Sequence, residues 1–238
     1  MLPPDHHSLE CQLYFDGLSE SWEANYGSDG SMAYRLRALV EELKQRVRIG
    51  GRILDFGSGA GDIAARCGQE GYKVDGIDPS VKMVERAKSR FSLEGVDFIS
   101  CADTLKLPFA DETFDGVVAS SVFEYVSRPQ EHLRELRRVC KDGGYQLLTV
   151  PNMGHPIRWV EAAEKRLLGS IRGRLPRTWR AREEYLALSV NRYSVRKWKK
   201  LLARAGWIEI AMKARFAPLR LVVVKKGATS VASSAKPV

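Results

Sequence analysis

The sequence lacks the marks of disulfide-rich, zinc-binding and membrane-spanning proteins. Its four cysteines are widely spaced and form no C-x-x-C pair, which argues against a disulfide framework and against zinc knuckles and favours a reducing compartment. No window approaches 18 consecutive apolar residues, and the first ten residues lack the basic and apolar segments of a secretion signal. We therefore expect a cytoplasmic protein without a membrane-spanning helix.

The composition indicates a globular chain. It has 238 residues, of which 44% are apolar and 28% are charged, so it can bury a core without the help of a metal or a disulfide. We expect one domain over residues 1–226. The small and polar residues of 227–238 bury too little surface to become ordered, so this segment is expected to be a disordered tail.

Basic residues are concentrated near the end of the chain. The net charge is +9, and residues 192–226 alone carry eleven basic side chains and one acidic side chain. Residues 156–184 carry eight basic and four acidic side chains. Such a distribution suits a nucleic acid, an anionic membrane surface or an acidic substrate, and it is equally compatible with a solvated face.

Short β-branched runs alternate with amphipathic segments through the middle of the chain, which is the pattern of βαβ units. The predicted strands are 52–56, 72–77, 96–100, 114–119 and 145–150, and the predicted helices between them are 62–69, 81–91 and 129–140. The last of these helices precedes KDGG, in which glycine suits a helix stop. An open α/β sheet follows from this order.

Two further segments flank the βα units. Residues 1–50 are expected to form a capping segment with several aromatic side chains, followed by a helix over 32–48. After the fifth strand the βα rhythm stops over residues 152–191, which we interpret as an inserted helical lid. A helix over 194–205 and two strands, 207–213 and 219–224, then complete the chain.

The most specific motif is RILDFGSGAGDIA, in which an apolar strand runs into Asp55 and then into Gly57, Gly59 and Gly61 before a helix. The dinucleotide fingerprint G-x-G-x-x-G requires its third glycine where Asp62 stands here, which weakens an NAD interpretation. Glycines at a strand end allow backbone N–H groups to approach a ligand, and the helix N-terminus favours an anionic group.

Polar residues also follow the next three strands. Asp78 ends the second strand, where a carboxylate can accept both hydroxyls of a ribose. The third strand is followed by Ala102, Asp103 and Thr104, which are placed to pair with an adenine edge, and the fourth ends at Ser120. Because parallel strands end at one edge of the sheet, these loops are expected to surround one crevice.

With these motifs, the chain resembles the class I S-adenosylmethionine-dependent methyltransferases, in the group that includes quinone-biosynthesis enzymes. The resemblance implies a Rossmann-like seven-stranded sheet of order 3-2-1-4-5-7-6 with a lid inserted before the last helix and hairpin. It also implies that the chain binds S-adenosylmethionine and releases S-adenosylhomocysteine. The cofactor-binding residues that it implies are Tyr14, Trp22, Asp55, Gly57, Ser58, Gly59, Gly61, Asp78, Pro79, Ala102, Asp103, Thr104 and Ser120.

One departure from the family concerns the segment after the fourth strand. Many relatives have a histidine where this chain has Tyr125, so neither a metal nor a proton role carries over from that position. The asparagine-proline tetrapeptide of amino-group methylation is missing from the same region, which favours an oxygen or carbon acceptor. By position, Tyr125 and His155 are the candidate catalytic bases. No metal site is expected, because the other histidines show no metal spacing.

The predicted function is methyl transfer to a small-molecule acceptor, lipidic or anionic, held under the 152–191 insertion. Within that insertion, Ile157, Val160, Leu167, Leu168 and Ile171 recur at helical spacing among basic residues. This pattern predicts either a lid helix packed on the core or a peripheral membrane contact through residues 157–182. An RNA methyltransferase and a non-catalytic S-adenosylmethionine-binding protein are the alternatives, with nucleic acid the less favoured partner. The oligomeric state stays open.

Overall fold

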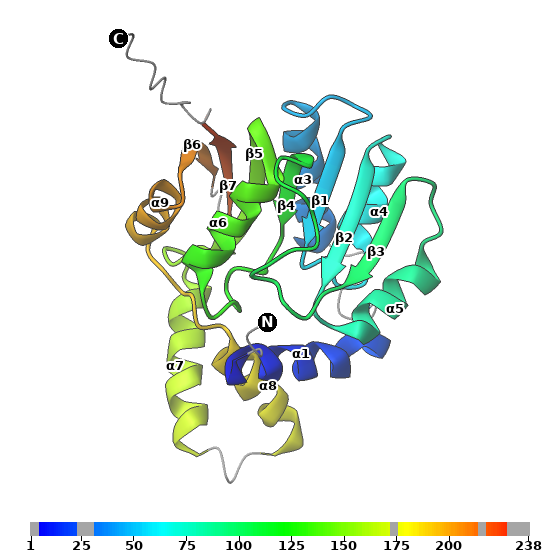
Figure 1. Ribbon diagram of the computed structural model, residues 1–238. Coiled ribbons are helices and arrows are strands. Elements are labelled where there is room, and N and C mark those ends of the chain that lie inside the picture. Colours follow the sequence, from blue (N-terminus) through cyan, green and yellow to red (C-terminus); the bar gives the residue numbers. More distant parts are fainter. Residues whose placement is uncertain (1–4, 23–30, 172–175, 214–217, 228–238) are drawn as a thin grey trace.

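A seven-stranded sheet forms the centre of the molecule (Figure 1). The computed structural model describes residues 5–22, 31–171, 176–213 and 218–227. The strand order is β3-β2-β1-β4-β5-β7-β6, in which β7 runs antiparallel between β5 and β6 and the other neighbouring pairs are parallel. The strands are β1 (Arg52–Phe56), β2 (Lys73–Asp78), β3 (Val96–Ser100), β4 (Phe114–Ala119), β5 (Cys140–Pro151), β6 (Trp207–Lys213) and β7 (Leu219–Lys226). The predicted fold and strand order are therefore confirmed.

Helices cover both faces of the sheet because each turns one apolar stripe toward it. On one face lie α3 (Ser31–Lys44), α4 (Asp62–Gln69) and α5 (Val81–Arg90), and on the other lie α6 (Pro129–Val139) and α9 (Val195–Arg204). In α3, Leu39 and Leu43 are fully buried, as their helical spacing predicts. These two layers hold the sheet rigid and fix the ends of its strands.

The predicted glycine stop of the third βα helix is wrong. α6 ends at Val139, and β5 begins at the next residue, where Cys140 pairs with Phe114 of β4. Gly143 has a φ of 76°, and a Cβ on Gly144 would lie 2.7 Å from Cys140 Sγ. The two glycines therefore serve a tight bend at the start of a strand, and the helix ends because Cys140 joins the sheet.

Two helical segments lie beyond the ends of the parallel strands (Figure 1). The first is α1 (His6–Leu18) with the short 3-10 helix Ser19–Ser21, and the second is a hairpin of α7 (Ile157–Ser170) and α8 (Arg177–Leu188). The hairpin occupies the predicted insertion at 152–191. The domain limits stay predictions, and the predicted tail lies, apart from Gly227, outside the described residues.

Candidate active site

A tight turn after β1 forms the floor of the site. The backbone N–H groups of Gly57 and Ser58 donate to the carbonyl oxygen of Ile77 at 2.8 and 3.0 Å, which ties the turn to the end of β2. Gly57 has a φ of 74°, and a Cβ there would lie 2.3 Å from Val122 Cγ2. Only glycine fits this position, because both the left-handed conformation and the close approach of the β4 loop exclude a side chain.

The carboxylate of Asp78 lies beside this turn. Its two oxygens accept hydrogen bonds from the N–H groups of Gly59 and Ser80, both at 2.9 Å. Burial raises the pKa of Asp78 to about 6, although these two hydrogen bonds act in the opposite direction. Burial also raises the pKa of the neighbouring Asp55 to about 7. The site therefore contains two carboxyl groups whose ionised forms are costly without a ligand.

An indole ring covers the turn from the side of the N-terminal segment. The Trp22 ring is the nearest side chain to a Cβ built on Gly59, at 3.4 Å. Its Nε1–H donates to Asp62 Oδ2 at 3.1 Å, and Arg90 of α5 forms an ion pair with the same carboxylate at 2.7 Å. Asp62, which replaces the third fingerprint glycine, thus holds an aromatic side chain over the pocket.

The loop after β4 closes the opposite side. Ser121 has a φ of 57°, and its N–H donates to the Thr149 hydroxyl at 2.8 Å. Arg35 of α3 donates to the Ser121 hydroxyl at 2.6 Å, which brings a cation to the pocket wall. A positive charge near the glycine turn favours the anionic end of a ligand.

Tyr125 lies where this loop meets α1. Its ring packs edge-on against Phe15 with centroids 5.3 Å apart, and its carbonyl oxygen lies 2.7 Å from His7 Nε2. Tyr125 also forms a hydrogen bond with Tyr185 of α8, which lowers the pKa of Tyr185 against the larger, opposing effect of burial. The candidate base is thus held between α1 and the insertion.

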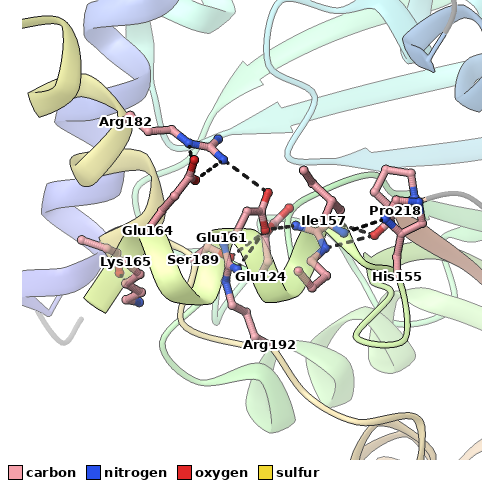
Figure 2. A network of polar contacts seen from close by, with 12 residues as sticks. Glu124, His155, Ile157, Glu161, Glu164, Lys165, Arg182, Ser189, Arg192 and Pro218 are labelled. Carbon is pink, nitrogen blue, oxygen red and sulfur yellow. Dashed lines mark hydrogen bonds and ion pairs between the residues drawn. The ribbon is translucent and has the colours of Figure 1, made fainter. Parts of the chain in front are cut away.

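A buried polar network joins the site loop to the insertion (Figure 2). Glu124 is 3% exposed and accepts a hydrogen bond from the Ser189 hydroxyl at 2.9 Å. Glu161 of α7 forms ion pairs with Arg158 at 2.7 Å and with Arg192 at 2.9 Å. Because these groups are buried together, the α7–α8 hairpin is fixed to the segment that carries Tyr125.

Two adjoining pockets occupy this region. The first extends from the glycine turn to Trp22 and the β4 loop, and the second lies beside the segment after β3. Cys11, Gln12, Pro79 and Tyr125 line both, so the two pockets share a wall. The crevice lies at the ends of β1 and β4, where the strand order reverses, as expected for a ligand site in an open α/β sheet.

Most of the residues predicted for the cofactor meet at this crevice. The predicted residues that line the two pockets are Trp22, Gly57, Ser58, Gly59, Asp78, Pro79, Ala102, Asp103, Thr104, Ser120 and Tyr125. Asp55 and Gly61 lie behind the turn: Asp55 is buried under it, and a Cβ on Gly61 would lie 2.8 Å from the Phe98 ring.

Two predicted residues are not brought to the crevice. Tyr14 lines neither pocket; burial raises the pKa of its hydroxyl, with smaller effects from Tyr185, Glu184 and Arg182 of α8. His155 lies in the loop before α7, where its Nδ1 accepts a hydrogen bond from the Ile157 N–H at 3.3 Å, and it lines neither pocket (Figure 2). Its candidacy as a base gains no support from this position.

Several residues that line the first pocket carry no specific signal in the sequence. These are Cys11, Gln12, Phe15 and Arg35. Phe15 is one of the aromatic side chains of the predicted capping segment, and helix phase decides that it, not Tyr14, faces the site. Arg35 reaches Ser121 across 86 residues of sequence, so only the tertiary structure reveals the contact.

The pocket has free hydrogen-bonding capacity that suits the expected cofactor. The hydroxyl oxygens of Ser58 and Ser120 are buried and have no hydrogen-bond partner among the described residues. Both residues line the first pocket together with Asp78 and the glycine turn. A buried polar group without a partner is costly, so a polar ligand fits here. Within the residues that the structure describes, no group of three or more His, Cys, Asp or Glu side chains is arranged to hold a metal ion.

Comparisons with known proteins agree with this geometry. A family model described as a methyltransferase domain matches residues 54–148. The demethylmenaquinone methyltransferase of Renibacterium salmoninarum is 36% identical over 153 residues, covering 64% of this chain and 62% of that protein. Residues 54–148 are thus a methyltransferase domain, and the similar proteins and solved structures include S-adenosylmethionine-dependent methyltransferases. The predicted family is confirmed, and S-adenosylmethionine is confirmed as the methyl donor of that family.

Two further comparisons define the extent of the likeness to other methyltransferases. The ubiquinone/menaquinone biosynthesis C-methyltransferase UbiE of Desulfotalea psychrophila is 42% identical over 97 residues, covering 40% of this chain and 39% of that protein. The structure of magnesium protoporphyrin IX methyltransferase from Synechocystis PCC 6803 with bound S-adenosylhomocysteine superimposes with a TM-score of 0.69 at 17% identity, over 93% of this chain and 100% of that one. The chain matches less than two thirds of the length of the first curated relatives.

Proposed function

We propose that this methyltransferase transfers a methyl group from S-adenosylmethionine to an oxygen or carbon atom of a small-molecule acceptor, lipidic or anionic. The observation that carries the proposal is the crevice at the β1–β4 reversal, where a glycine turn and a buried carboxylate converge with two hydroxyls that have no partner in the described chain. Relatives that act on demethylmenaquinone and on malonyl-[acyl-carrier protein] support a small or carrier-bound acceptor.

The residues of the crevice divide into three groups around the donor. Asp78 would accept the ribose hydroxyls, which favours its ionised form and lowers its pKa from about 6. The glycine turn, Ser58 and Arg35 would hold the amino-acid end, and Asp103 with its neighbours would face adenine. When bound, S-adenosylmethionine supplies a methyl group on a positively charged sulfur that is already a good leaving group.

The contribution of the protein is then to position the acceptor and exclude water. Alignment of two reactants can lower a barrier by roughly 7 to 11 kcal/mol. Phe15 and Trp22 provide apolar walls on the side of the N-terminal segment. Tyr125 is the one candidate base that lines the crevice, and its hydroxyl is oriented by Tyr185. In its ionised phenolate form, a tyrosine so placed can take the proton of an acceptor hydroxyl or acidic carbon.

A lipidic acceptor is consistent with the surroundings of the site. The insertion that carries Tyr185 lies next to α1 over the crevice, and it exposes several large apolar side chains. Peripheral membrane contact through residues 157–182 is part of this proposal. Among the described residues, no helix is both long and apolar enough to cross a bilayer.

Label transfer tests this function directly. The protein is incubated with S-[methyl-14C]adenosylmethionine and an extract of the cells that produce it, and the extract is then separated into lipids, water-soluble small molecules, RNA and protein. We expect label in one small-molecule or lipid fraction and none with Gly57→Val, whose side chain would fill the turn. Label in RNA would instead support an RNA methyltransferase. Donor binding without any transfer would support a non-catalytic protein.

A further inference from the structure

Helix α7 buries charged side chains and exposes most of its apolar ones, which is the reverse of the usual amphipathic helix. Its buried side chains are Arg158, Glu161 and Leu168. Its large apolar side chains are exposed instead, with Trp159 at 70%, Leu167 at 63% and Val160 at 51%. Of the apolar residues predicted to form a stripe here, only Leu168 packs inward; the rest of the stripe, with Trp159, forms what we call the apolar face of α7 (Ile157, Trp159, Val160, Leu167 and Ile171).

The spacing of these residues explains why they share a face. Successive residues of a helix are rotated by about 100°, so Val160, Leu167 and Ile171 lie within a narrow arc, with Trp159 and Ile157 at its two edges. Arg158 lies on the opposite side, and Glu161 lies between Arg158 and Ile157. A helix with such an apolar arc normally turns it toward the core.

The polar face of α7 is held in place by contacts that prevent the helix from rotating (Figure 2). The Arg158 guanidinium donates to the Pro218 carbonyl oxygen at 2.7 Å and pairs with Glu161. Glu161 also pairs with Arg192, and Glu164 pairs with Arg182 of α8 at 2.8 Å. Rotation would leave buried charges without partners, which costs more than exposed apolar surface. The buried ion pairs of α7 therefore keep its apolar face exposed.

The charges around this face indicate its partner. Residues 157–182 contain eight basic and two acidic side chains, a net charge of +6. Both acidic side chains, Glu161 and Glu164, are engaged in the ion pairs just described, whereas Arg166 and Arg180 are exposed. A second tryptophan, Trp179 of α8, is also 51% exposed. Apolar side chains, indole rings and cations in one segment match the headgroup region of an anionic bilayer.

The same charges argue against a second copy of this chain as the partner. In a symmetric dimer through this surface, identical cations would face one another without acidic counterparts. With 14 residues, α7 is about 21 Å long, so it is too short to cross a bilayer and suits contact in the membrane plane.

We propose that residues 157–171 and 176–182 bind the surface of a bilayer containing anionic phospholipid, with the apolar face of α7 and Trp179 among the headgroups and Arg166 and Arg180 against the phosphates. This inference rests on the membrane contact in the proposed function and assigns that contact to particular residues and to anionic lipid. Binding at this surface does not depend on donor binding.

Vesicle co-sedimentation of the full chain tests this surface. The probes are vesicles of phosphatidylcholine alone and of an equimolar mixture of phosphatidylcholine and phosphatidylglycerol. We expect binding to the mixed vesicles that weakens as salt rises, because exposed charges are screened. Trp159→Ser with Leu167→Ser should lower this affinity at least tenfold, since two large apolar side chains no longer leave water. The matched control Leu13→Ser, which alters an exposed leucine of α1, should not change it.

The outcomes separate this surface from the methyltransferase site. Unchanged affinity for S-adenosylhomocysteine in the double variant would show that the fold is intact, so that lost vesicle binding belongs to the surface. Failure of the wild type to bind mixed vesicles, or equal binding by the double variant, would overturn the proposal. A wild-type dimer that becomes a monomer in the double variant, without vesicle binding, would identify a second copy as the partner.

Discussion

Replacing Asp78 by asparagine should remove a defined part of the pH dependence of folding in the ligand-free protein. Burial raises the pKa of this carboxyl from 3.8 to about 6. The folded state therefore binds the proton of Asp78 more tightly than the unfolded state does. This difference stabilises the fold fully below pH 3.8, and the stabilisation is lost as the pH rises through about 6. Between pH 5 and pH 8 the free energy of unfolding should fall by about 1.4 kcal/mol because of this one group.

The difference between wild type and Asp78→Asn isolates that contribution. Groups that titrate alike in both proteins cancel, so urea unfolding at pH 5 and pH 8 should show the stability difference, wild type minus variant, decreasing by about 1.4 kcal/mol. Asp97→Asn, which alters an exposed carboxylate on β3, is the control and should give a constant difference. A constant difference for Asp78→Asn as well would refute the claim that burial raises the pKa of Asp78 in the folded protein.

Ligand affinity should depend on pH in the opposite direction from stability. Ribose hydroxyls that donate to Asp78 stabilise the ionised carboxylate, so the affinity for S-adenosylhomocysteine should increase about tenfold between pH 5 and pH 8. In Asp78→Asn the affinity should be lower and nearly independent of pH over this range.

Three other variants probe the turn, the candidate base and the network under α7. Gly57→Ala should weaken S-adenosylhomocysteine binding more than tenfold because its Cβ meets Val122, and Val122→Ala should restore part of the loss in calorimetry; equal affinity in Gly57→Ala would show a looser turn. Tyr125→Phe should lower kcat at least tenfold with little change in donor affinity, and an unchanged kcat would leave Tyr125 as a pocket wall. Arg158→Met should destabilise the fold by about 3 kcal/mol in urea, because Glu161 loses a buried partner; a loss below about 1 kcal/mol would contradict the rigid attachment of α7.

The sheet and the cofactor side of the site could be predicted because local sequence determines them. The apolar runs define the strands, and the polar residues that end them must meet at one edge of a parallel sheet. The places of Gly57 and Asp78 in the site could therefore be predicted from the strand order alone. Strand bounds were correct to within a residue or two, except for β5, where the extra pairing of Cys140 extends the strand.

The remaining parts depend on contacts between distant segments. Helix periodicity identified an apolar stripe in α7 but not the direction in which it points, because Arg158 is held by Pro218 from a later part of the chain. The choice between Tyr14 and Phe15 depends on how α1 packs beside α5 and α8, which its weak amphipathic pattern does not encode. Position alone makes His155 a candidate base, and in the structure it lines neither pocket of the crevice.

The central claim is that the crevice between β1 and β4 binds the methyl donor. Equilibrium dialysis of the folded wild-type protein against radiolabelled S-adenosylmethionine, with unlabelled S-adenosylhomocysteine as competitor, measures this directly. We expect saturable retention at one site per chain that the competitor abolishes. Folded protein that retains no label at any donor concentration would contradict the account.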